Sequence, residues 1–296
     1  MKGKLKPKDR IEDETAGSME GKTILITGAT SGIGKATAMG LAKLGASIVF
    51  TARDVDKAEA AKLEISEKSG NKNVEFMVCD LASFDSIREC CNAFAAKHER
   101  LDVLISNAGV WDYKRKESRD GIENTFATNY LAPFMMTNLL LGLLKKSAPS
   151  RIVNVASALH DGSIDFGDIE FKRRPFSGTG AYRQSKLSLI LFTKLLAEKL
   201  KGTGVVVNCL HPGVIATNIM REANLAYKGF FRTFGKSPEK GAETSIYLAS
   251  SHEIENVTGE YFANKKIARS SRESNDMTLA RRLWEASVKY TGLVQY

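Results

Sequence analysis

The feature of the sequence that most constrains the fold is an alternation of short apolar runs with longer helical patterns. Most of the short runs are continuously apolar, which is typical of strands buried on both faces. They span residues 23–27, 47–52, 74–80, 103–106, 151–157, 205–210 and 260–263. Helical patterns separate them near residues 33–45, 55–69, 83–98, 119–146, 180–202 and 238–251. The alternation predicts a doubly wound α/β domain, with a mainly parallel seven-stranded sheet and helices on both faces.

The two ends of the chain differ from this α/β core. Residues 1–20 carry alternating lysines, then an acidic run and no apolar segment, so we expect a solvated tail and no signal peptide. Residues 21–263 form the predicted domain, and residues 264–296 form a C-terminal extension that ends in a helix. The extension holds seven basic and three acidic side chains. It could touch an anionic membrane surface weakly, although a solvated segment is the simpler expectation.

Composition excludes several classes of protein. The net charge of +9 favours anionic ligands, but no recognised motif for nucleic acid accompanies it. No stretch reaches the roughly 18 apolar residues of a membrane span. The four cysteines form neither a disulfide framework nor a metal-binding pattern, so we expect no metal site and a reducing, cytoplasmic location.

The first apolar run leads directly into a glycine-rich turn and a helix. Residues 27–34 read TGATSGIG, with Gly28, Gly32 and Gly34 spaced so that the backbone can approach a phosphate around Ser31 and Ile33. The N-terminus of the helix that follows offers free N–H groups to such an anion. The spacing differs from the common GxGxxG dinucleotide motif, and glycines also serve ordinary turns.

The end of the second apolar run bears on the choice of cofactor. An acidic residue there would bind the ribose 2′-hydroxyl of NAD, but Ala52 stands in its place. Arg53 follows, and its guanidinium suits the 2′-phosphate of NADP, with Lys35 as further support. Two alternatives stay open: Arg53 is solvated while Asp54 caps the next helix, or Asp54 binds the ribose and the cofactor is NAD.

Three side chains could carry proton transfer. Tyr182 and Lys186 stand four apart in a helical pattern, so they project from one face. An ammonium favours the ionised form of a neighbouring phenol, which makes Tyr182 a candidate proton donor or acceptor. Ser157, at the end of its apolar run, could bind a substrate oxygen as charge develops on it. Each residue alone is more often an ordinary surface or turn residue.

The ordered set of motifs resembles the short-chain dehydrogenase/reductase family over roughly residues 20–263. The set comprises TGATSGIG, Asp80-Leu81, Asn107-Ala108-Gly109, Asn129, Ser157, Tyr182-x-x-x-Lys186 and Pro212-Gly213. The resemblance implies a Rossmann-type fold and hydride transfer between a nicotinamide cofactor and a carbonyl or alcohol. It also implies that Asn129, Ser157, Tyr182 and Lys186 are catalytic, with Asn129 holding a water that links Lys186 to solvent.

The resemblance also assigns further cofactor contacts. Asp80, with Leu81, resembles the residue that meets the adenine amino group. Asn107, with Ala108 and Gly109, resembles the lining of the adenosine ribose. The loop that would hold the nicotinamide carboxamide and the pyrophosphate contains Pro212, Gly213, Ile215 and Thr217.

Two long segments could form the substrate pocket. Residues 217–238 contain seven large aliphatic or aromatic side chains, which favours an apolar substrate: Ile219, Met220, Leu225, Tyr227, Phe230, Phe231 and Phe234. Residues 158–181 could form the opposite wall, where His160 could touch substrate but is expected to be a solvated loop histidine. Residues 164–166 with 181–187, residues 208–217 and residues 281–285 resemble the retinol dehydrogenase-like branch, which acts on retinoids and other apolar aldehydes, usually with NADP.

Together these features predict an NADP(H)-dependent carbonyl reductase that acts on an apolar aldehyde, ketone or retinoid-like substrate. Two alternatives remain: an NAD-dependent alcohol dehydrogenase, and a nucleotide-sensing binding protein without catalysis. The apolar helices near residues 130–144 and 187–196 could bury surface between subunits of a homo-oligomer.

Overall fold

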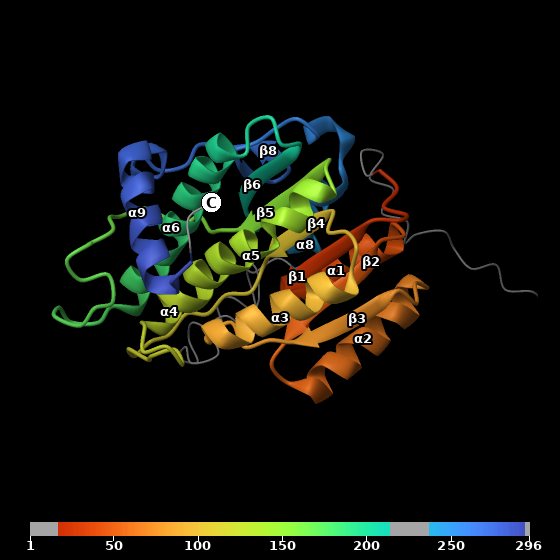
Figure 1. Cartoon of the computed structure of the whole chain (residues 1–296), viewed down its shortest axis with the longest axis horizontal. Coiled ribbons are helices and arrows are strands. Elements are labelled where there is room, and N and C mark those ends of the chain that lie inside the picture. The colour runs from red at the N-terminus through yellow and green to blue at the C-terminus, as the bar shows by residue number, and fades with distance from the viewer. Residues whose placement is uncertain (1–16, 214–236, 294–296) are drawn as a thin grey trace, which may run out of the picture.

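The computed structural model describes residues 17–213 and 237–293 and is built around one sheet (Figure 1). The strand order is β3-β2-β1-β4-β5-β6-β7-β8, and every neighbouring pair is parallel except β7 and β8. The fold class predicted from the sequence is confirmed. The strands are β1 (Thr23–Thr27), β2 (Ser47–Ala52), β3 (Val74–Val78), β4 (Val103–Ser106), β5 (Ser150–Val155), β6 (Val205–His211), β7 (Tyr261–Ala263) and β8 (Lys266–Ile267).

The predicted count of seven strands was short by one. The additional strand, β8, pairs antiparallel to β7 through Phe262 with Ile267 and Ala263 with Lys266. Asn264 and Lys265 make the turn between them with positive φ angles of 50° and 63°. Since β8 has two exposed residues and no apolar run, the hydrophobic pattern could not reveal it.

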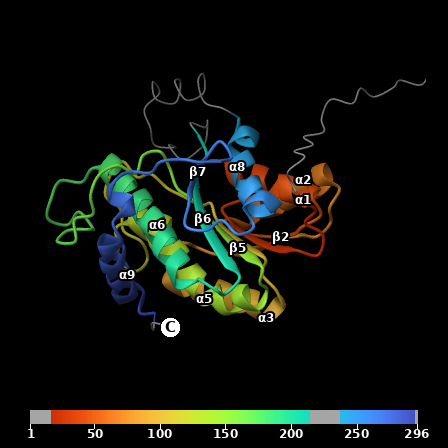
Figure 2. The same cartoon turned by 90° about the horizontal axis from the view of Figure 1, so that it is seen from above.

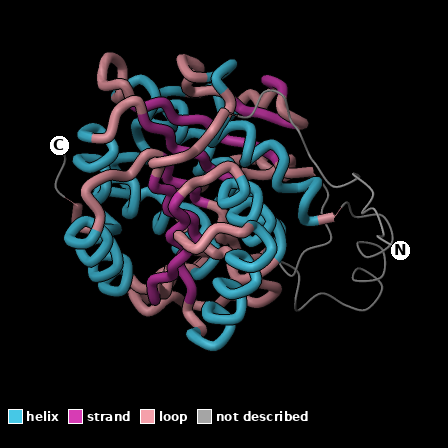
Figure 3. Tube along the Cα trace, turned by 90° about the vertical axis from the view of Figure 1, so that its right-hand side faces the viewer, coloured by secondary structure: helices cyan, strands magenta, loops and turns pink. Residues whose placement is uncertain are grey.

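Helices cover both faces of the sheet (Figures 2 and 3). One layer holds α1 (Gly32–Lys43), α2 (Val55–Ser69) and α8 (Pro238–Ser250), and the other holds α3 (Phe84–Lys97), α5 (Ala132–Lys146) and α6 (Gly178–Lys199). The sheet is buried on both sides because alternate residues of β1 enter different core clusters, Leu25 on one face and Ile24 and Ile26 on the other. Within the described ranges, no helix is long and apolar enough to cross a membrane.

The helix predicted over residues 119–146 is divided and starts later. Its parts are α4 (Asn124–Phe126), a π-helical turn η1 (Ala127–Leu131) and α5. Glu123 is the N-cap, and its carboxylate accepts hydrogen bonds from the Thr125 and Phe126 N–H groups at 2.9 and 2.7 Å. Pro133 lacks the N–H that an α-helix would direct to the Asn129 carbonyl, so a wider turn is tolerated there.

The C-terminal extension packs against the domain through α9 (Met277–Thr291), which lies along α6 (Figure 1). Leu283 is fully buried, and the Trp284 ring lies 5.0 Å from Phe134 and 5.9 Å from Phe192 between ring centroids. The Tyr130 hydroxyl meets Ser287 Oγ at 2.6 Å. Part of the apolar surface of α5 and α6 is therefore covered by the chain itself.

The described end of the N-terminal segment also contacts the domain. Met19 lies within the stretch expected to be a solvated tail, yet it is buried. Its N–H donates to the Leu44 carbonyl at 2.8 Å, and the Gly17 N–H donates to the Ser250 carbonyl at 3.3 Å. Residues 17–20 are thus in contact with the ends of α1 and α8.

Replacing Leu283 by Ala should destabilise the protein by about 2–5 kcal/mol, because a fully buried side chain would leave a cavity between α9 and α6. Urea unfolding measures the change. The exposed Glu285, two residues away on the same helix, supplies the control Glu285→Ala, which should cost under about 0.5 kcal/mol. Equal stabilities for wild type and Leu283→Ala would show that α9 does not belong to the cooperative core.

Candidate active site

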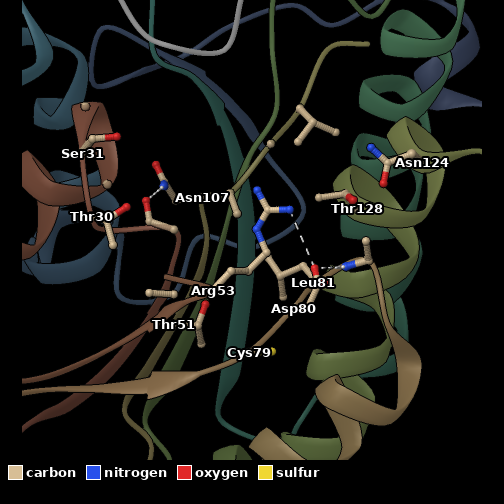
Figure 4. A pocket seen from close by; sticks show the side chains of 18 of the residues that line it. Thr30, Ser31, Thr51, Arg53, Cys79, Asp80, Leu81, Asn107, Asn124 and Thr128 are labelled. Carbon is tan, nitrogen blue, oxygen red and sulfur yellow. Dashed lines mark hydrogen bonds and ion pairs between the residues drawn. The ribbon is translucent and has the colours of Figure 1, made fainter. Parts of the chain in front are cut away.

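A cavity of about 520 Å³ opens where the strand order reverses beside β1 (Figure 4). In open α/β sheets ligands bind at such a switch point, beyond the carboxyl ends of the strands. The cavity brings together the cofactor residues predicted from the first, second, third and fourth strand ends. These are Gly28, Ser31, Gly32, Ile33, Gly34, Arg53, Asp80, Leu81, Asn107, Ala108 and Gly109.

The glycine-rich turn is shaped by close backbone contacts. Gly28 and Gly32 have φ angles of 71° and 58°, which side-chain-bearing residues rarely adopt. A Cβ on Gly34 would lie 2.3 Å from the Gly28 carbonyl oxygen and 2.4 Å from Asn107 Nδ2. Asn107 Nδ2 itself donates to the Thr27 and Gly28 carbonyls at 2.9 and 3.1 Å, so it fixes the turn from the β4 side (Figure 4).

The N-terminus of α1 faces the cavity without a side-chain cap. Ser31 is the N-cap residue, but its hydroxyl makes no capping hydrogen bond among the described residues, and the first turn holds no acidic side chain. The first N–H groups of α1 and the positive end of its dipole are therefore free to meet an anion. This end of the cavity fits the pyrophosphate of a dinucleotide.

Arg53 and Asp80 lie together at another part of the cavity (Figure 4). Arg53 Nη1 lies 3.9 Å from Asp80 Oδ1, and the Arg53 side chain is 66% exposed. Asp80 Oδ1 also accepts the Ala82 N–H at 3.1 Å, which holds the carboxylate in place. The guanidinium can therefore turn to a phosphate with little loss of existing contacts.

The two neighbours considered alongside Arg53 are engaged elsewhere. Asp54 is the N-cap of α2: its carboxylate accepts the Lys57 N–H at 3.1 Å and pairs with Lys57 Nζ at 2.5 Å. It does not line the cavity. Lys35 Nζ pairs with Glu64 at 2.6 Å and does not line the cavity either, so this structure gives Lys35 no part in phosphate binding.

Ser157, Tyr182 and Lys186 meet between the end of β5 and the first turns of α6. The Ser157 side chain lies close enough to the Tyr182 phenol to lower its pKa. Lys186 Nζ donates to the Val155 carbonyl at 2.8 Å and lies 5.6 Å from the centroid of the Tyr182 ring. Tyr182 and Lys186 are only 6% and 2% exposed. Ser157 thus meets two residues that lie 25 and 29 positions further along the chain.

Burial dominates the protonation of this cluster. It raises the pKa of Tyr182 to about 12, and the hydrogen bond from Ser157 offsets part of that rise. It lowers the pKa of Lys186 from its ordinary 10.5 to about 8. The Lys186 ammonium is directed at the Val155 carbonyl. Burial, and not the expected stabilisation of the phenolate by Lys186, therefore dominates the pKa of Tyr182.

Asn129 joins the segment after β4 to the catalytic helix. Its Oδ1 accepts the Val110 N–H at 2.8 Å, and its Nδ2 donates to the Val110 carbonyl at 2.9 Å and to Ser185 Oγ at 3.1 Å. The side-chain amide is thus committed to protein partners. The water-holding role implied by the resemblance stays a prediction.

Trp111 is a site residue that the sequence did not suggest. Its indole stacks on the Tyr182 ring, with centroids 4.4 Å apart and planes 14° apart. It also lines the cavity, so it connects the cavity to Tyr182. The sequence feature that could have indicated a site role for Trp111 is its position two residues after the Asn107-Ala108-Gly109 motif.

The remaining predicted site residues lie near or beyond the limits of the described chain. Pro212 and Gly213 follow β6, and Gly213 has a φ angle of 96°, but neither lines the cavity. Ile215, Thr217 and most of the 217–238 segment lie outside the described residues.

The expectation that His160 is a solvated loop histidine was wrong. Its side chain is 6% exposed, and its Nδ1 lies 2.7 Å from the Ser157 carbonyl oxygen.

The cavity at the switch point of the sheet, with the buried Tyr182 stacked on its lining residue Trp111, fits the class of nicotinamide-dependent oxidoreductases. The chain belongs to the short-chain dehydrogenase family, whose model, described as short chain dehydrogenase, matches residues 22–228. The wider similarity places it in the retinol dehydrogenase-like branch of that family.

Three relatives illustrate this similarity. Retinol dehydrogenase 13 of Mus musculus is 43% identical over 285 residues, which cover 93% of this chain and 85% of the relative. A crystal structure of an uncharacterised protein from Mycobacterium Paratuberculosis has a TM-score of 0.77 at 31% identity, covering 94% of this chain and 96% of that one. The Pseudomonas aeruginosa RhlG/NADP active-site complex has a TM-score of 0.67 at 27% identity, covering 83% and 95%.

Because burial lowers the pKa of Lys186 to about 8, the unfolded chain binds more protons at this residue than the folded protein between pH 8 and 10.5. The Lys186 contribution to the free energy of unfolding should therefore increase with pH across that window, by about 1 kcal/mol per pH unit. Urea unfolding of wild type and Lys186→Met at pH 7, 8, 9 and 10 isolates it. The stability of the wild type should rise relative to that of Lys186→Met above pH 8, and parallel pH curves would contradict the shift.

Proposed function

We propose that this protein is an NADP(H)-dependent oxidoreductase that transfers a hydride between the nicotinamide and a carbonyl or alcohol group of an apolar substrate. The observation that carries the proposal is the cluster of Ser157 with buried Tyr182 and Lys186. The stacked indole of Trp111, which lines the cavity, connects this cluster to it. Family membership supports the class of reaction.

In the proposed reduction, Tyr182 donates its phenolic proton to the substrate oxygen, and Ser157 donates a hydrogen bond to the same oxygen. The bound nicotinamide supplies or accepts the hydride. With a pKa of about 12, Tyr182 is protonated at neutral pH, which is the state that a proton donor needs. In the oxidative direction it must first lose that proton, and the nearby Lys186 ammonium stabilises the resulting phenolate.

The proposed preference for NADP(H) rests on Arg53. Its guanidinium lines the cavity next to Asp80, while Asp54, the acid that could otherwise bind a ribose hydroxyl, is occupied as the cap of α2. An exposed arginine beside a ribose site favours a phosphate over a hydroxyl by charge and by geometry.

The proposed substrate class rests on two features. The relatives that are 39–43% identical over 92–94% of this chain are named retinol dehydrogenases, and retinol is apolar. The segment 217–238 has the aromatic and aliphatic composition of an apolar wall. We therefore propose an aldehyde, ketone or retinoid-like molecule, with turnover of NADPH over a panel of such compounds as the direct test.

We also propose a cytoplasmic location. The four cysteines are buried free thiols with no disulfide among them, as is usual for proteins of reducing compartments. Fractionation of cells that express the full chain tests this, and recovery with membranes would contradict it.

Tyr182→Phe should lower kcat at least about 100-fold, since it removes the transferred proton and keeps the ring. NADPH binding should persist, because the predicted adenosine and phosphate contacts are untouched. Steady-state turnover and a fluorescence titration measure the two effects. The control is Tyr113→Phe, an exposed tyrosine of the segment after β4, which should keep kcat. A Tyr182→Phe variant with near wild-type turnover would overturn the catalytic assignment.

Arg53→Ala should raise the Kd for NADPH about tenfold or more, in line with roughly 1.5–3 kcal/mol for a charge-assisted hydrogen bond, while the Kd for NADH changes little. Titration of both cofactors against wild type and variant gives the comparison. Lys35→Ala is the matched control, since Lys35 is paired with Glu64 outside the cavity. Equal losses for NADPH and NADH would refute the 2′-phosphate role.

A further inference from the structure

The segment that carries Ser157 leaves the sheet at the end of β5 and is held at nearly every backbone position described. The Val155 carbonyl accepts Lys186 Nζ, and the Ala156 N–H donates to the Leu210 carbonyl at 2.8 Å. The peptide unit formed by the Ser157 carbonyl and the Ala158 N–H lies beyond the regular sheet ladder. Two histidines and the Tyr261 hydroxyl provide its hydrogen bonds instead.

We propose that His160 and His211 are positioning residues that clamp the Ser157–Ala158 peptide unit from its two sides, in opposite neutral tautomers. This inference rests on the proposed function, in which Ser157 binds the substrate oxygen. Neither histidine needs to touch the substrate in this proposal. Both act through the backbone that aims the Ser157 hydroxyl.

His160 holds the carbonyl side of the peptide unit. Its Nδ1 lies 2.7 Å from the Ser157 carbonyl oxygen, and the Tyr261 hydroxyl donates to the same oxygen at 3.1 Å. A carbonyl oxygen only accepts, so Nδ1 must carry a proton. The other ring nitrogen, Nε2, accepts the Ser271 N–H at 3.0 Å and therefore carries none. Together the two contacts define one neutral tautomer, with the proton on Nδ1.

His211 holds the amide side. It is the last residue of β6, and its Nδ1 accepts the Ala158 N–H at 3.1 Å and the Gly213 N–H at 3.4 Å. Because two N–H groups point at Nδ1, this nitrogen is unprotonated and the proton of the neutral ring is on Nε2. The tautomer of His211 is thus the reverse of that of His160.

The clamp has a direct geometric consequence for Ser157. A peptide unit is planar, so fixing its oxygen on one side and its hydrogen on the other fixes the plane that follows the serine Cα. The direction of the Ser157 hydroxyl toward Tyr182 depends on that plane. A displacement of about 1 Å at a reacting group can lower the rate about 100-fold. Two imidazoles that hold the backbone of Ser157 in place can therefore affect turnover strongly.

The clamp also joins distant parts of the chain at the catalytic serine. Ser271 belongs to the C-terminal extension, Tyr261 to β7 and His211 to β6. The His160 ring packs on the Tyr261 ring with centroids 5.0 Å apart. Gly213, on the segment predicted to hold the nicotinamide, shares the His211 acceptor with Ala158. The serine and the nicotinamide segment are therefore aligned by a single imidazole.

The tautomers can be tested without any assay of activity. The chain has four histidines, so a ¹⁵N-histidine-labelled sample gives a spectrum that single substitutions can assign. His160 should show the Nδ1–H tautomer and His211 the Nε2–H tautomer at neutral pH. An Nε2–H tautomer or a doubly protonated ring at His160 would overturn the clamp.

Paired substitutions test whether the hydrogen bonds, and not the bulk of the rings, matter. His160→Asn keeps an N–H donor and His211→Asn keeps an oxygen acceptor at about the Nδ1 position, whereas Leu at either place keeps neither. Each Leu variant should lose about 10–100-fold in kcat, and each Asn variant should stay within about threefold of wild type. NADPH affinity of His160→Leu should be unchanged. Equal losses for Asn and Leu would contradict the proposal, and the melting temperature of each variant checks folding.

A double-mutant cycle with Ser157→Ala separates positioning from general damage. If His160 acts through Ser157, His160→Leu should have almost no further effect on kcat once the serine hydroxyl is gone. Additive losses would show that His160 acts elsewhere and would overturn the proposal. If Ser157→Ala itself retains full turnover, the proposed role of Ser157 fails, while the tautomer spectrum still reports on the clamp.

Discussion

The constraint on which the rest of this structure depends is the hydrogen-bonded register of a parallel sheet that is buried on both faces. Buried backbone groups must be paired, and the parallel ladder pairs them while directing every carboxyl end to the same edge. The glycine-rich turn after β1, Arg53 after β2, Asp80 after β3, Asn107 after β4 and Ser157 after β5 meet there for that reason. Helices on both faces bury the central strands in two core clusters.

Exclusion of water also sets the chemistry of the site. The cluster of Tyr182 and Lys186 lies deep enough that desolvation outweighs its local hydrogen bonds, so the phenol of Tyr182 is held protonated and the ammonium of Lys186 is destabilised. A charged lysine buried in this way lowers the stability of the folded state. The hydrogen bond from Lys186 Nζ to the Val155 carbonyl offsets part of that loss. The same burial strengthens electrostatic interactions with any charge that develops on a substrate oxygen.

Most of the fold and much of the site could be predicted from local pattern. The bounds of β1, β2 and β4 were predicted as the structure has them, because each is a continuous apolar run with polar or glycine residues beyond it. The predicted start of the helix at residue 119 was wrong, because the hydrophobic pattern could not show that Glu123 would cap the N-terminus of α4. Trp111 and the two histidines were missed or misjudged because their contacts join residues far apart in sequence.

By itself the sequence determined the order of the elements, the glycine-rich turn after β1, the arginine after β2 and the spacing of Ser157, Tyr182 and Lys186. These follow from residue type and short-range spacing, which hydrophobic burial and backbone geometry translate directly into structure. The tertiary structure alone decided that Asp54 caps α2, that Asn129 ties Val110 to α6, that Trp111 stacks on Tyr182 and that His160 and His211 enclose the Ser157–Ala158 peptide. Each of these polar or aromatic side chains had several partners of suitable chemistry, and only the packing of the sheet and helices selects which one lies within reach.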